Sequence, residues 1–148
     1  MKLKNELGFT LVELLVTGMI MAIVAAIAAP GFSGLIRNYK LTNAARVVWL
    51  DLQRAKMMAI KQGTTMKIDF TSTPYTIVRA DTPTVVILSR NLSSDYPGIT
   101  VSLVGTAQSV SFTSTGTLLP PNKTVQIQGP TRSKSFTIIT TGRIGQIS

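Results

Sequence analysis

Residues 8–30 read GFTLVELLVTGMIMAIVAAIAAP. The 21 residues from Phe9 to Ala29 form an apolar run with one charge, Glu13. Because about 20 apolar residues in a helix suffice to cross a bilayer, the run predicts a membrane-spanning helix. An ionisable side chain inside a membrane is costly and marks a functional position, so Glu13 needs a cationic partner. No Lys or Arg occurs between Lys4 and Arg37, and therefore the neighbouring sequence does not supply that partner.

The basic leader, residues 1–8, and the following residues 9–15 (FTLVELL) resemble the class III signal of type IV pilins and type II secretion pseudopilins. The resemblance implies that a prepilin peptidase cleaves the Gly8–Phe9 bond at the cytoplasmic membrane face and methylates the new amino group of Phe9. It also implies that Glu13 pairs with the terminal amine of a neighbouring subunit during fibre assembly. The basic leader agrees with the positive-inside rule, and glycine gives a protease a peptide without a side chain.

Three other descriptions of this segment are open. A secretory signal peptide would explain the basic start and the small residues Ala26-Ile27-Ala28, but 21 apolar residues exceed the ~7–15 of such signals, and Glu13 interrupts them. A plain membrane anchor leaves Glu13 and the Gly8–Phe9 junction unexplained. A chance motif in a buried helix disagrees with the length of the run and with its basic leader.

Composition narrows the classes of function. The chain has no Cys and no His, which excludes disulfides, thiol catalysis and histidine-based metal or acid–base sites. Six acidic residues make a carboxylate cluster hard to assemble. We therefore expect no enzyme activity, no cofactor, no metal and no small-molecule substrate. The net charge of +9, or +8 without the leader, favours acidic partners such as nucleic acid, anionic lipid or acidic subunits.

Beyond the apolar run the sequence predicts a continued helix. Pro30 and Gly31 interrupt the run, and Pro30 predicts a kink or local melting over Ala26 to Pro30. Residues 32–62 then resume a helical pattern with one apolar stripe: Leu41, Ala45, Val48, Leu52, Ala55 and Ala59, broadened by Ala44. The opposite side carries Arg46, Gln53, Arg54 and Lys61, with Leu50 and Met57 among them. That side is either a solvated face or a contact surface for neighbouring subunits.

The period changes after Gly63. Seven short segments rich in Val, Ile and Thr read as strands: 64–70, 75–79, 84–89, 99–104, 109–113, 124–128 and 135–140. One long helix followed by short strands predicts an α+β, pilin-like fold, with a long N-terminal helix packed on an antiparallel, β-rich C-terminal head. The expected segments are a leader (1–8), a transmembrane and fibre-core helix (9–29), its amphipathic continuation (30–62) and the head (63–148).

Later segments extend the resemblance to the FimT/GspH family: 41–45 (LTNAA), 52–55 (LQRA), 59–63 (AIKQG), 112–116 (FTSTG) and 141–144 (TGRI). This resemblance implies a minor pilin of a type IV pilus or a minor pseudopilin of a type II secretion system. It implies a single-pass protein of the bacterial inner membrane with its head in the periplasm or outside. Its partners would be the prepilin peptidase, the inner membrane and other pilin or pseudopilin subunits.

A third function follows from the basic tail. Some FimT-type minor pilins of transformable bacteria bind DNA through a Gly-Arg-x-Arg element, whereas residues 142–145 here read GRIG and lack the second arginine. The DNA-binding candidates are the four cations after Pro120, where no acid occurs: Lys123, Arg132, Lys134 and Arg143. The alternative is structural, with residues 132–134 in a solvated hairpin turn and Arg143 at a strand end.

Overall fold

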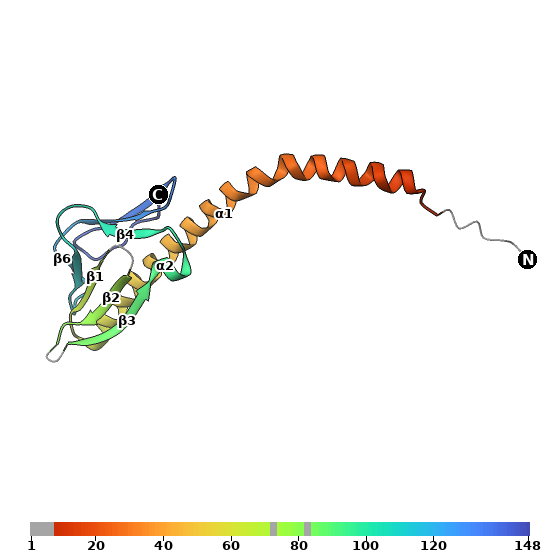
Figure 1. The fold of residues 1–148 in the computed structure, drawn as a ribbon. Coiled ribbons are helices and arrows are strands. Elements are labelled where there is room, and N and C mark those ends of the chain that lie inside the picture. The colour runs from red at the N-terminus through yellow and green to blue at the C-terminus, as the bar shows by residue number, and fades with distance from the viewer. Residues whose placement is uncertain (1–7, 72–73, 82–83) are drawn as a thin grey trace, which may run out of the picture. The chain divides into compact units, whose positions relative to one another are not determined.

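The computed structural model describes residues 8–71, 74–81 and 84–148, with the side chains of residues 29–31 left aside. The chain divides into an N-terminal unit that ends at Ile36 and a compact C-terminal unit, Arg37–Ser148. Helix α1, Leu11–Gln62, runs through both units (Figure 1). The connection between the predicted strands 64–70 and 75–79 falls partly on residues outside the described ones.

Both ends of α1 have recognisable caps. At the start, Thr10 Oγ1 accepts a hydrogen bond from the Glu13 amide at 3.2 Å, as in the Thr-x-x-Glu capping pattern. At the end, the amide of Thr64 donates to the carbonyl oxygen of Ala59 and that of Gly63 to Ile60, which is the Schellman arrangement. Gly63 adopts φ 65°, where a side chain would be strained. The sequence period therefore changes at Gly63 because the helix ends there.

The predicted apolar stripe of α1 is confirmed. Its members and Ala44 are all buried: Leu41, Ala44, Ala45, Val48, Leu52, Ala55 and Ala59. Small alanines let the helix axis approach the sheets closely, and the stripe shares one hydrophobic core with the strands. The C-terminal unit begins at Arg37 because this part of α1 belongs to the same core.

Two antiparallel sheets complete the C-terminal unit. The first has five strands in the order β3-β2-β1-β5-β6, and the second has three in the order β4-β7-β8. The strands of the first sheet are β1 Met66–Phe70, β2 Pro74–Arg79, β3 Val85–Asn91, β5 Ser109–Phe112 and β6 Leu118–Leu119. Those of the second are β4 Thr100–Leu103, β7 Lys123–Gln128 and β8 Ser133–Ile138, and a short helix, α2 Leu92–Asp95, precedes β4.

All seven predicted strands are present, with ends shifted by two residues at most. The prediction missed β6, which has two residues, and α2, which has four. Both are too short to show a period in the sequence. The prediction of an antiparallel α+β fold is confirmed, and the division of its strands between two sheets is additional information from the structure.

The C-terminal tail is fixed to the second sheet and to α1. Ile144 bridges to Ile138 of β8, and the amide of Gly145 donates to Thr137. From the helix, Trp49 Nε1 donates to the carbonyl oxygen of Gly145 at 2.9 Å. Among the described residues every buried side chain lies between Leu41 and Ile144, so the C-terminal unit has a complete core of its own.

Candidate functional site

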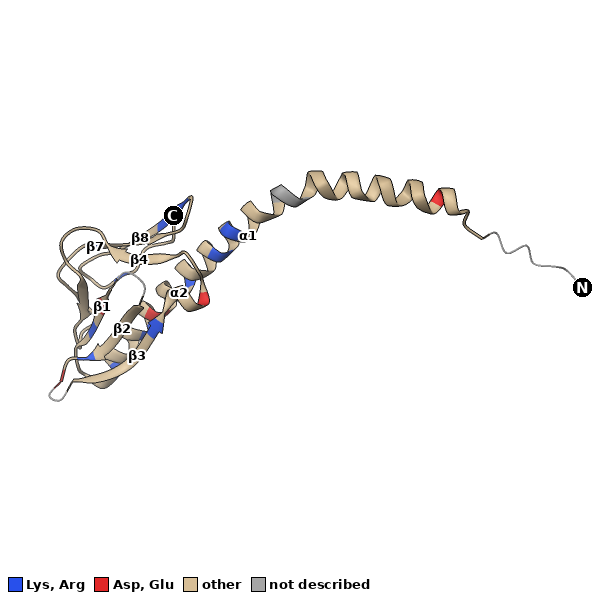
Figure 2. Ribbon diagram, in the orientation of Figure 1, with Lys and Arg blue, Asp and Glu red and all other residues tan. Residues whose placement is uncertain are grey.

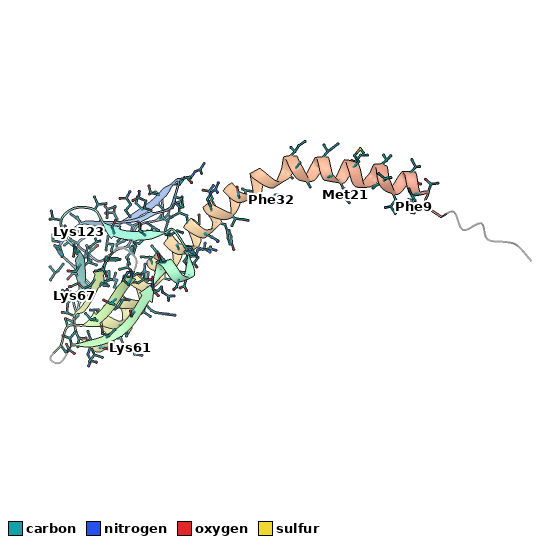
Figure 3. All side chains as sticks on the ribbon, in the orientation of Figure 1. Phe9, Met21, Phe32, Lys61, Lys67 and Lys123 are labelled. Atoms are coloured by element: carbon teal, nitrogen blue, oxygen red, sulfur yellow. The ribbon has the colours of Figure 1, made fainter. Side chains whose placement is uncertain are left out.

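The predicted cleavage site lies where the described part of the chain begins. Gly8 and Phe9 precede the first turn of α1, and both are exposed. A Cβ built on Gly8 would meet no other atom within 4 Å, and the side chain of Phe9 projects freely, as Figure 3 shows. The rest of the predicted leader, residues 1–7, lies outside the described residues. Where the chain is described, nothing shields the Gly8–Phe9 bond.

Glu13 is in the first turn of α1 and is exposed. Its two hydrogen bonds use its backbone: the amide donates to Thr10 Oγ1 and the carbonyl accepts from Thr17 Oγ1 at 2.6 Å. The carboxylate is stabilised by the helix dipole, which favours anions at the N-terminus. Within the described part of the chain it forms no ion pair. Its pairing with an amine of another subunit stays a prediction.

The helix beyond Glu13 is apolar on all sides. Leu11–Ala28 has a mean hydropathy of 2.4, and none of it is buried against other parts of the described chain. Its exposed side chains include Leu14, Met19 and Ile27. A helix that is hydrophobic all round needs an apolar surrounding, which is either lipid or other helices. By length and composition this segment can cross a membrane.

The predicted kink at Pro30 stays a prediction. The helical assignment of α1 runs without a break from Leu11 to Gln62 and includes residues 26–30. The side chain of Pro30 itself lies outside the described residues.

The four candidate DNA-binding cations form two pairs. In the β7–β8 hairpin, Lys123 lies opposite Ile138 at one end, whereas Lys134 lies opposite Ile127 at the other. Arg132 is in the turn beside Lys134, and the carbonyl of Arg143 accepts from Ile139 at 3.1 Å beside the Lys123 end. Lys123 and Ile127 are four positions apart on β7, about 13 Å at 3.3 Å per residue. The structure therefore does not bring the four cations together on one loop.

The Gly142–Arg143 element has a packing role. Gly142 is buried and adopts φ 72°. A Cβ built there would lie 1.8 Å from the carbonyl oxygen of Gly116 and 3.3 Å from Cε of Lys56. Only glycine fits so close to another backbone. The element closes the tail against α1 and the loop at Gly116, and the Arg143 side chain is exposed.

A polar cluster that the sequence analysis missed lies beneath the five-stranded sheet. Asp51 is the one charged residue in the described structure that is buried, 3% exposed. Its Oδ2 accepts from the Tyr75 hydroxyl at 2.5 Å and from Arg90 Nε at 2.8 Å. Arg54 lies 3.9 Å from Oδ1. The signal was available, because Asp51 is three residues after Val48 and four before Ala55, on the buried face.

The cluster shifts two pKa values. Burial first, and then the hydrogen bond to Asp51, raise the pKa of Tyr75 far above its usual value. The hydrogen bond to Asp51 raises the pKa of Arg90. The three groups tie α1 to β2 and to the edge strand β3. Among the described residues no group of three or more His, Cys, Asp or Glu side chains is arranged to hold a metal ion.

Comparison with known families gives two matches. The family model for type II transport protein GspH matches residues 44–142, and the model for the prokaryotic N-terminal methylation motif matches residues 3–29. The second match covers the apolar helix and the Gly8–Phe9 junction. No curated protein matches the sequence.

Two kinds of solved structure share the fold. The type IV minor pilin FimU of Pseudomonas aeruginosa is 20% identical, with a TM-score of 0.64 over 77% of this chain and 92% of that chain. The minor pseudopilin EpsH of the Vibrio cholerae type II secretion system is 14% identical, with a TM-score of 0.59 over 74% of this chain and 96% of that chain. The long helix followed by antiparallel sheets is therefore the pilin-like fold.

Proposed function

The chain belongs to the GspH family of type II transport proteins and is a minor pilin or pseudopilin, and we propose that it is a minor pilin that helps to prime and assemble a type IV pilus. The observation that carries the assignment to a pilin-type subunit is the N-terminal segment, which resembles that of both type IV pilins and pseudopilins. A Gly8–Phe9 junction after a basic leader, a lone acid at Glu13 and an apolar helix occur in one stretch.

Processing is the first step of the proposed function. A prepilin peptidase cleaves the Gly8–Phe9 bond and methylates Phe9, which then becomes the first residue. The methylation motif over residues 3–29 and the exposure of both residues support this step. Until assembly the chain is held in the inner membrane by its apolar helix, residues 9–29, with the C-terminal unit outside the cytoplasm.

Assembly is the second step. The apolar surface of α1 passes from lipid to the helices of other subunits, and Glu13 pairs with the amine of a neighbour's first residue. Two unit charges 4 Å apart attract by about 4 kcal/mol at an effective dielectric constant of 20. A carboxylate left unpaired in an apolar core would cost several kcal/mol, so the pair selects the correct axial register.

Glu13→Ala tests this role. Both hydrogen bonds of Glu13 use its backbone, so the variant keeps the local helix and should be cleaved normally. Incorporation into fibres, measured by immunoblot of sheared pili, should fall at least tenfold. Thr17→Ala, one turn further along the same exposed helix, is the matched control and should assemble normally. Wild-type incorporation of Glu13→Ala would remove the charge-pairing argument.

A minor pseudopilin of a type II secretion system is the second candidate, and the GspH family model favours it. Deletion of the gene in its own host separates the two. Loss of surface pili and of pilus-dependent motility with normal secretion supports the pilus. Loss of secreted enzymes with normal pili identifies a pseudopilin.

Binding of DNA for natural transformation is a less favoured alternative, because the candidate cations form two separate pairs. Gel-shift titration of the C-terminal unit with duplex DNA at low salt tests it, since phosphate contacts are strongest there. Absence of retardation would exclude this role. We propose no enzymatic activity and no small-molecule substrate, and hydrolytic activity of the C-terminal unit would overturn that view.

A further inference from the structure

A basic groove lies where the β7–β8 turn meets α1. Its volume is about 470 Å³, and it is lined by Asn38, Leu41 and Thr42 of the helix and by Arg132, Ser133 and Lys134 of the hairpin. We call this region, together with Arg37 and Lys40, the basic pole. Figure 2 shows the blue cations of α1 and of the second sheet.

Backbone packing holds the two sides of the groove together. The amide of Gly129 donates to the carbonyl oxygen of Arg132 at 2.8 Å and closes the turn. A Cβ on Gly129 would lie 3.4 Å from Cδ1 of Leu41, so the turn rests directly on the buried stripe of α1. Arg132 and Lys134 therefore have fixed backbone positions beside the helix.

The charges of the basic pole are unneutralised. Arg37 lies four residues before Leu41 on the same face of α1. Lys40 is three residues after Arg37 and therefore lies beside it on the helix surface. None of Arg37, Lys40, Arg132 and Lys134 forms an ion pair with a described residue. The four aspartate side chains of the C-terminal unit are engaged elsewhere, each with a cation within 3.9 Å: Asp51, Asp69, Asp81 and Asp95.

The position of these charges in the chain indicates their partner. Arg37 is the first charged residue after Glu13 and lies eight residues beyond Ala29. Asn38, on the groove wall, is ten residues beyond Ala28, the last residue of the apolar span. Ten residues span about 15 Å as a helix and at most about 35 Å when fully extended, so the groove stays within reach of the headgroup layer however the two units are arranged. Cations at this point of a membrane-anchored chain meet lipid phosphates first.

We propose that the basic pole binds the anionic lipid headgroups of the bilayer that anchors the chain, and that this contact orients the C-terminal unit before assembly. The inference rests on the proposed membrane anchoring. Guanidinium groups bind phosphate oxygens in a bidentate way, and Asn38, Thr42 and Ser133 supply further polar groups in the same groove. Extraction into a fibre must break the contact, so it also holds the subunit in its stored state.

The C-terminal unit alone, Arg37–Ser148, is suitable for the test because it contains the complete core. Its binding is titrated with vesicles of phosphatidylcholine alone and with vesicles containing 30% phosphatidylglycerol, at physiological salt. Juxtamembrane cations contribute a factor of about five each, so Arg132→Gln/Lys134→Gln should weaken binding to the anionic vesicles about 30-fold. Neutral vesicles should not bind.

Lys123→Gln/Arg143→Gln is the matched control. It removes the same charge from the other end of the hairpin, about 13 Å away and beyond the ~8 Å Debye length at this salt. We expect an effect below about threefold. Equal losses for both double variants would indicate attraction by net charge and would overturn the proposal. Displacement of the C-terminal unit from anionic vesicles by inorganic phosphate at constant ionic strength would also overturn the proposal. So would binding to duplex DNA that is tighter than binding to vesicles, if only the DNA binding depends on Arg132 and Lys134.

A second measurement uses the full chain in nanodiscs. The sequence has no cysteine, so Ser133→Cys provides a unique labelling site in the groove and Thr141→Cys a matched one at the far end. A fluorophore at residue 133 should be quenched by headgroup nitroxide lipids much more than one at residue 141. Equal quenching would contradict the proposal. Failure of either lipid test would refute this inference and leave the cleavage and Glu13 assays unaffected. A chain that is not cleaved but whose C-terminal unit binds lipid would refute only the proposed function.

Discussion

Asp51→Ala should destabilise the C-terminal unit by about 2–4 kcal/mol. The variant removes the acceptor of the Tyr75 hydroxyl, whose residue is 1% exposed, and an unsatisfied buried hydroxyl costs about 1–3 kcal/mol. Arg90 loses its closest partner, but its side chain is 28% exposed and Asp95 remains 3.8 Å away. We therefore expect a loss somewhat smaller than the roughly 3–5 kcal/mol typical of breaking a fully buried pair. Arg54, 74% exposed, adds little.

A double variant tests the physical reason. Tyr75→Phe removes the hydroxyl and keeps the ring, so in the Asp51→Ala background it also removes the orphaned polar group. The double variant should be more stable than Asp51→Ala alone by about 1 kcal/mol or more. In the wild-type background the same Tyr75→Phe change should be destabilising. Additive effects of the two substitutions would refute the role assigned to this hydrogen bond.

The assay is urea unfolding of the C-terminal unit, with thermal unfolding as a check. For about 110 residues a loss of 2–4 kcal/mol corresponds to a fall in Tm of roughly 8–16 °C. Asp69→Ala is the matched control, because this aspartate, whose side chain is 36% exposed, also has a cation, Lys67, at 2.8 Å. A surface pair contributes at most about 1 kcal/mol. If both alanine variants lost the same stability, burial of Asp51 would not be the cause.

Three further outcomes are expected. The raised pKa of Tyr75 leaves its phenol neutral in the folded state, while the unfolded phenol ionises near pH 10. The stability that the neutral Tyr75 phenol contributes is therefore present below pH 10. Above pH 10 the free energy of unfolding should fall by up to about 1.4 kcal/mol per pH unit, and less steeply in Tyr75→Phe. Equal slopes of the two proteins in urea unfolding would contradict this prediction. Trp49→Phe removes the hydrogen bond to the carbonyl oxygen of Gly145, so hydrogen exchange of the Ser148 amide should accelerate about fivefold, while exchange in β1 stays the same. Unchanged exchange at Ser148 would show that other contacts hold the tail in place. Gly142→Ala should destabilise by more than 2 kcal/mol because its Cβ would overlap Gly116, whereas Gly63→Ala, with open space, should cost about 1–2 kcal/mol for its φ alone; equal losses would refute the packing argument.

The periodicity of apolar residues in the sequence predicted the helix and the strands that bury one face and expose the other. The stripe from Leu41 to Ala59 and the alternation of Met66, Ile68 and Phe70 both result from one-sided packing, and both are visible in the sequence. The partition of strands into two sheets was not visible, because it depends on pairing between distant segments. Strand β6 pairs with β5 through only two residues, too few for a pattern.

The candidate site residues divide in the same way. Gly8, Phe9 and Glu13 could be proposed from the sequence because their spacing is local and a charge in an apolar run is conspicuous, and their roles stay predictions. The separation of Lys123 from Lys134 depends on the hairpin register, which places them opposite Ile138 and Ile127. Arg132 lies beside α1 because the β7–β8 turn packs on Leu41. Counting the cations in the tail of the sequence shows neither the separation of Lys123 from Lys134 nor the position of Arg132 beside α1.

The amino terminus of the protein isolated from membranes tests the central claim most directly. Intact-mass analysis and N-terminal sequencing should find a chain that starts at methylated Phe9. A chain that starts at Met1, or one cleaved near Ala29 as in a secretory signal peptide, would contradict the assignment of this protein as a processed pilin-type subunit.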